Sequence, residues 1–168
     1  SQLKIFKSTY DKAVFDPWTN NESLWADVDK IKSHIKLIYF AGGEPFVQEG
    51  HYKLLEFLVN NKCTNIELEY NTNLSYDSKF KSYDIEDLWR HFKSIQLWPS
   101  IEGFKERAEY GRKGLSWELF EKNSLKFSKY INTFSLVNNI FSVSSIPELI
   151  KWIKEQNKTF YITNLTNP

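Results

Sequence analysis

The chain has 168 residues, of which 41% are hydrophobic and 17% aromatic, and its 22 basic and 21 acidic residues leave a formal net charge of +1. This length suits one domain with its own core and falls short of the roughly 250 residues of a complete eight-unit barrel. The composition excludes a disordered chain, and the balanced charge gives no sign of a nucleic-acid surface.

Cysteine usage restricts the chain further, because Cys63 is the only cysteine in the sequence. An internal disulfide, a cysteine-rich zinc site and a cysteine-ligated cluster are therefore excluded for these residues alone, and a reducing, cytoplasmic setting fits. The N-terminal residues lack the apolar stretch of a signal peptide, and no stretch approaches the roughly 18 apolar residues of a membrane span. We expect a cytoplasmic protein.

Helical stripes of apolar residues alternate along the chain with short apolar runs, which is typical of successive helix and strand units. Asp84 is a plausible N-cap of one helix, and Pro147 is acceptable in the first turn of another. The expected helices cover residues 24–31, 54–58, 85–91, 117–125 and 146–153, and the expected strands residues 35–40, 66–70, 94–98, 132–137 and 159–163. The pattern predicts an α/β fold: a partial (β/α) barrel of about five parallel strands with flanking helices. We expect one domain over residues 1–168, with an N-terminal loop and helix (1–34) followed by the five strand units (35–168).

Small and amide residues follow each predicted strand. Because the carboxyl ends of parallel strands lie at one edge of a sheet, we expect these residues to gather there. Adjacent glycines expose backbone groups, and amides both donate and accept hydrogen bonds, which suits an amino-acid or ribose moiety. Each element alone is more often a plain turn, so their recurrence carries the prediction. They are Gly42-Gly43-Glu44-Pro45, Asn71 and Asn73, Ser100 and Glu102, Asn138, and Asn164.

Together these elements resemble radical S-adenosylmethionine (SAM) enzymes, most closely members that carry a twitch domain. The stretch from Leu37 to Pro45 resembles the family's GGEP segment, and Asn71-Thr72-Asn73 its T-N element. Ser100-Ile101-Glu102-Gly103 resembles the S-x-D-G element, followed by two arginines, Arg107 and Arg112, where the family often has one for the SAM carboxylate. Val137-Asn138-Asn139 and residues 164–168 resemble the next two strand ends, so the resemblance covers about residues 35–168.

The resemblance implies a partial barrel that binds SAM across this edge. The backbone of the Gly42–Pro45 segment would hold the methionine amino group, and Ser100 with an arginine would hold the carboxylate. No catalytic or metal-binding residue is expected. The expected cofactor-binding residues are Gly42, Gly43, Glu44, Pro45, Asn71, Asn73, Ser100, Glu102, Arg112 and Asn138.

Two departures from the family pattern limit this expectation. Glu102 stands where the family usually has the shorter Asp, and the three-cysteine motif for a [4Fe-4S] cluster is absent from the sequence. Clusters are held chiefly by thiolates, whereas Cys63, His34 and His91 are expected away from the site. Only His51 among the histidines is expected to face it, although a polar residue at a helix start is the simpler interpretation.

Three functions stay open at this point. The first is a fragment of a radical SAM enzyme, inactive by itself, whose full-length parent would bind SAM and a [4Fe-4S] cluster and act on a small molecule or a peptide. The second is a cluster-free module that binds SAM or a peptide. The third is a phage or cellular interaction protein that pairs through an exposed sheet edge. A carboxylate pair of Glu44 and Glu102 for glycoside chemistry is less favoured.

Overall fold

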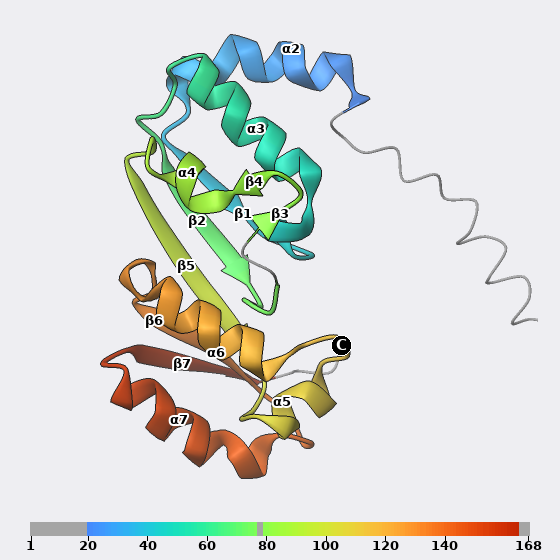
Figure 1. Ribbon diagram of the computed structural model, residues 1–168, viewed down its shortest axis with the longest axis vertical. Coiled ribbons are helices and arrows are strands. Elements are labelled where there is room, and N and C mark those ends of the chain that lie inside the picture. Colours follow the sequence, from blue (N-terminus) through green and yellow to red (C-terminus); the bar gives the residue numbers. More distant parts are fainter. Residues whose placement is uncertain (1–19, 77–78, 165–168) are drawn as a thin grey trace, which may run out of the picture. The chain divides into compact units, whose positions relative to one another are not determined.

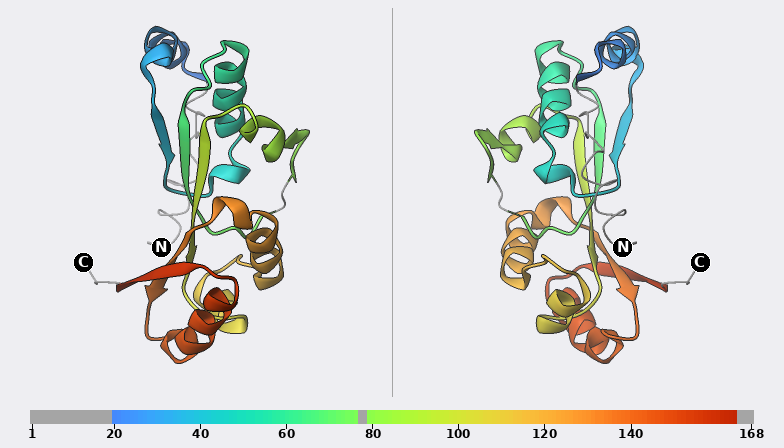
Figure 2. Two further views of the ribbon diagram at one scale, coloured as in Figure 1. Left: turned by 90° about the vertical axis from the view of Figure 1, so that its left-hand side faces the viewer. Right: turned by 90° about the vertical axis from the view of Figure 1, so that its right-hand side faces the viewer.

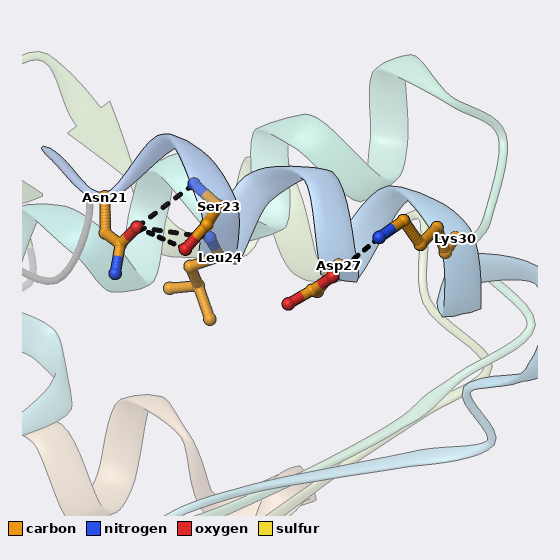
Figure 3. A network of polar contacts seen from close by, with 5 residues as sticks. All are labelled: Asn21, Ser23, Leu24, Asp27 and Lys30. Atoms are coloured by element: carbon orange, nitrogen blue, oxygen red, sulfur yellow. Dashed lines mark hydrogen bonds and ion pairs between the residues drawn. The ribbon is translucent and has the colours of Figure 1, made fainter.

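The computed structural model describes residues 20–76 and 79–164. Its internal contacts divide the chain into two units, Ser1–Ser33 and His34–Pro168, which we describe separately. In the first unit, α2 (Glu22–Ile31) confirms the first expected helix. Figure 3 shows its start, where Asn21 Oδ1 accepts hydrogen bonds from the backbone N–H of Ser23 (3.0 Å) and Leu24 (3.4 Å). These bonds satisfy N–H groups that a helix start leaves without partners.

The second unit is built on five parallel strands in the order β1-β2-β5-β6-β7 (Figure 1). The strands are β1 (Leu37–Phe40), β2 (Glu67–Thr72), β5 (Ser94–Ile101), β6 (Thr133–Asn138) and β7 (Thr159–Asn164), and a separate hairpin pairs β3 (Lys79–Phe80) with β4 (Tyr83–Asp84). The helices are α3 (Glu49–Asn60), α4 (Ile85–Trp89), α5 (Glu106–Gly111), α6 (Trp117–Lys126) and α7 (Ile146–Glu155). The predicted α/β fold with five parallel strands and flanking helices is confirmed.

The parallel strands follow one another in chain order, so right-handed crossovers bring their helices to the same face of the sheet. Figure 2 shows α3, α4 and α6 together on that face. Strand side chains that point toward the helices form the core, among them Leu68, Tyr70 and Leu97, each fully buried. A sequential sheet with helices on one face is also the arrangement of part of a (β/α) barrel.

The other face of the sheet is mostly polar, and we call it the polar face. Side chains alternate along strands, so residues between the core positions belong to it. Register keeps partners on the same face: Tyr39 lies opposite Glu69, and Glu69 opposite Gln96. On β1 this face carries Leu37 and Tyr39, which are 49% and 50% exposed. Its strand residues are Leu37, Tyr39, Glu67, Glu69, Asn71, Ser94, Gln96, Trp98, Ser100, Thr133, Ser135, Val137, Thr159, Tyr161 and Thr163.

The expected strand 94–98 was too short, because β5 continues through Pro99 to Ile101. A proline in a central strand lacks an N–H for the ladder and is accommodated at bulges. Here β5 meets β6 at the Leu97–Ile131 bridge and again at Ser100–Ser135, so β6 has one extra residue between the two contacts. This bulge lets the strand pass Pro99 and carries Ser100 into the sheet.

Three other strands end later than expected. Asn71, Asn138 and Asn164 are strand residues rather than loop residues. The short helix α5 and the β3–β4 hairpin were not predicted.

Candidate functional site

The loop after β1 exposes the backbone of two glycines. Gly42 and Gly43 have φ angles of +83° and +60°, which L side chains rarely adopt, and a Cβ at either position would meet nothing within 4 Å. Both residues are exposed. The peptide groups of this loop are therefore accessible to a ligand at the carboxyl edge of the sheet.

Glu44, the next residue, turns its side chain into the protein. Its carboxylate accepts hydrogen bonds from the hydroxyl of Thr72 (2.8 Å) and the backbone N–H of Asn73 (2.9 Å). Burial raises the pKa of Glu44 above its ordinary value, while these bonds, a bond from the Phe46 N–H and the positive charge of Arg112 oppose that rise. The side chain thus ties the end of β1 to the end of β2. The buried Pro45 follows and begins a short 3-10 turn.

Hydrogen bonds from within the protein hold the loop after β2 in place. Asn73 Oδ1 accepts a hydrogen bond from the Ser75 N–H (2.8 Å), which makes an Asx-type turn, and Leu74 has a positive φ of 50°. Asn123 of α6, only 1% exposed, donates from Nδ2 to the carbonyls of Leu74 and Tyr76, each at 2.7 Å. Sequence reasoning missed Asn123, whose one signal is an amide on the buried side of an apolar stripe.

The end of β5 gathers a hydroxyl, a guanidinium and a carboxylate. Arg112, just after α5, lies with Nη2 3.4 Å from Ser100 Oγ and forms an ion pair with Glu102. The Glu102 residue is 8% exposed, and its second oxygen, Oε2, is buried without a hydrogen-bond partner in the described part of the chain. The Arg112 side chain keeps 29% of its surface exposed. Of the two arginines considered from the sequence, this one reaches Ser100, whereas Arg107 is exposed.

Gly103 lets the same strand end pack closely against the residues that precede α7. A Cβ there would lie 2.9 Å from Ser142 Cβ and 3.0 Å from Ser145 Oγ, closer than side chains pack. Ser145 Oγ also accepts a hydrogen bond from the Phe104 N–H at 3.1 Å. Close packing at this point holds Glu102 and the backbone around it in place.

The two remaining asparagines of the predicted site, Asn71 and Asn138, lie on different strands. Asn71 is an exposed residue of the polar face, opposite Trp98. Asn138 is the partly buried last residue of β6, opposite Asn164 of β7. The structure brings Ser100, Glu102 and Arg112 into one group and links Glu44 to Asn73.

His51 belongs to the core rather than to this edge. Its Nε2 lies 3.1 Å from the Tyr70 hydroxyl, which also accepts a hydrogen bond from Trp89 Nε1 at 3.1 Å. Burial lowers the pKa of His51 to about 3, so the ring is neutral at ordinary pH. Cys63 precedes β2 at the opposite edge, and His91 is exposed, as expected.

The residues fit SAM better than a [4Fe-4S] cluster. A cluster needs several thiolates, and the sequence contains one. Among residues 20–76 and 79–164, no three His, Cys, Asp or Glu side chains converge as metal ligands. By contrast, a partly exposed arginine beside a serine hydroxyl suits a carboxylate. In the same ranges, no helix has the length and apolar character needed to cross a membrane.

Comparison with known proteins identifies no relative of this chain. No protein-family model, no curated protein and no solved structure gives a significant match to this chain.

Proposed function

We propose that the carboxyl edge of this sheet binds SAM through its methionine group, as part of a radical SAM enzyme. The observation that carries the proposal is the convergence of Arg112 and Ser100 at the end of β5. The positive charge of Arg112 also opposes the rise in the pKa of Glu44, the residue that follows Gly43. The Gly42–Gly43 loop follows β1 and Ser100 lies near the end of β5, so both elements that the family resemblance assigns to the zwitterion belong to the carboxyl edge of the sheet.

Each residue has a distinct role in this proposal. Arg112 donates N–H bonds to the ligand carboxylate, and the Ser100 hydroxyl donates a further bond. The carbonyl groups of Gly42 and Gly43 accept from the ligand ammonium group. Glu44, whose oxygens are already occupied by Thr72 and Asn73, holds the glycine loop in position instead of touching the ligand.

In radical SAM enzymes, bound SAM supplies a carbon-centred radical that removes a hydrogen atom from the substrate. The cluster required for that chemistry does not fit these residues, so we assign only SAM binding to this chain. Activity would depend on thiolates that the sequence does not contain. The single unpaired cysteine suits a cytoplasmic setting, where thiols stay reduced.

Calorimetric titration of the iron-free chain with three ligands tests the proposal. SAM and S-adenosylhomocysteine both carry the aminocarboxylate and should bind. Methylthioadenosine has the same nucleoside without the aminocarboxylate, and it should bind at least tenfold more weakly, about 1.4 kcal/mol. Equal affinity for all three ligands, or no heat with any of them at millimolar concentration, would overturn the proposal.

A further inference from the structure

The polar face of the sheet carries an unpaired negative charge. Its two acidic residues, Glu67 and Glu69, lie on β2. Glu67 forms an ion pair with Lys93 at 2.6 Å. The Glu69 side chain is partly exposed, and among the described residues its carboxylate forms no ion pair or hydrogen bond. None of the strand residues of this face is a lysine or arginine, so the charge of Glu69 is not neutralised from neighbouring strands.

Each of the two strands that flank β2 carries an aromatic residue near Glu69 on this face. Strand register puts Tyr39 directly beside Glu69 on β1, and neighbouring strands are about 4.8 Å apart. On the other side, Gln96 is the direct neighbour, and Trp98 is one step further along the same face. Gln96 is already engaged, since its Oε1 accepts from Asn132 at 2.8 Å and its Nε2 donates to the Leu97 carbonyl at 2.9 Å. The groups left for a ligand are one carboxylate and two ring systems.

A carboxylate between aromatic rings suits an alkylammonium ion. The rings attract a cation through their faces while they shield it from water, and the carboxylate supplies the opposite charge. The surroundings of Glu69 disfavour a phosphate or a carboxylate ligand, because no strand residue beside it is a lysine or arginine. Leu37 and Tyr161 of the same face are 49% and 43% exposed. Their exposed apolar surface is more than a small amine would cover, which favours a longer ligand.

We propose that the polar face binds a lysine side chain of a peptide, with the ammonium group at Glu69 between Tyr39 and Trp98. This deepens the proposed function by naming the substrate class, and it rests on that function for the chemistry. The row of Gln96 and Glu69 lies four residues below Ser100, about 13 Å along the strand. Residues that flank the lysine then lie between Glu69 and the strand-end group of Ser100 and Arg112.

Titration of the chain with acetyl-Gly-Lys-Gly-amide tests this site. The matched ligands are the same peptide with norleucine in place of lysine, and free L-lysine. We expect Glu69→Gln to weaken binding of the lysine peptide at least fivefold. Glu118→Gln, which removes an exposed carboxylate on α6, should leave the affinity unchanged. Circular dichroism verifies that both variants are folded.

Each outcome decides the proposal. A lysine peptide that binds better than the norleucine peptide and free lysine, with a loss specific to Glu69→Gln, supports it. Equal binding of the norleucine peptide, equal binding of free lysine, or equal losses in both variants overturns it. SAM affinity of Glu69→Gln should match that of the unsubstituted chain. If SAM fails to bind while the lysine peptide binds through Glu69, the SAM proposal fails and the lysine site stands.

Discussion

The two ends of the carboxyl edge use similar residues differently. At the β1–β2 end, the Glu44 carboxylate is bonded to Thr72 and Asn73, and Asn73 is bonded to Ser75. At the β5 end, Arg112 keeps part of its surface exposed, and one oxygen of Glu102 has no partner in the described part of the chain. The comparison shows that the Glu44 and Asn73 side chains of the first end are bonded within the fold, whereas the second end has the partly exposed guanidinium to which our proposal assigns the ligand carboxylate. Substitutions at the first end should therefore change stability, and those at the second should change binding.

The largest effect on stability is expected for Glu44→Ala. The change leaves the Thr72 hydroxyl and the Asn73 N–H without their acceptor, at a cost of about 3 kcal/mol in the free energy of unfolding. Urea denaturation measures the change as a lower midpoint with an unchanged slope. Exposed Glu118→Ala on α6 is the control and should change little. A loss below about 1 kcal/mol for Glu44→Ala would remove the structural role given to this carboxylate.

Asn123→Ala tests the support behind the same end. It removes the donor to the carbonyls of Leu74 and Tyr76, so unfolding should become about 2 kcal/mol more favourable. The matched variant is Asn132→Ala, which loses one exposed hydrogen bond to Gln96 and should cost about 0.5 kcal/mol. Similar losses in the two variants would show that the Asn123 bonds do not hold the β2 loop.

The buried His51 makes the stability of the fold depend on pH. Its pKa falls from 6.5 to about 3 on folding, so the unfolded chain binds the proton more readily. The stabilisation is complete above pH 6.5 and is lost as the pH falls toward 3, by about 1 kcal/mol between pH 6.5 and 5.5. His51→Phe should remove this slope in urea denaturation, and an unchanged slope would contradict the burial of a neutral ring. The raised pKa of Glu44 acts in the opposite direction, because the folded chain binds that proton more readily and stability is gained as the carboxyl protonates.

The fold follows from periodicity, but several of its details do not. Alternating helical and strand patterns predict the parallel sheet and which loops share an edge. Pro99 would normally end a strand, and the bulge that accommodates it depends on pairing with β6. Local sequence cannot show that Glu44 turns inward, because its partners lie 28 and 29 residues away. The choice of Arg112 over Arg107 depends likewise on where α5 ends.

The most direct test of the division between the two ends is the SAM affinity of paired arginine variants. Arg112→Lys keeps the charge and removes the planar fork that matches a carboxylate, so SAM should bind at least tenfold more weakly, about 1.4 kcal/mol. The Arg107→Lys variant changes an exposed arginine within α5 and should bind SAM as the unsubstituted chain does. Equal affinities in the two variants would contradict the account, because the β5 end would then not hold the ligand carboxylate.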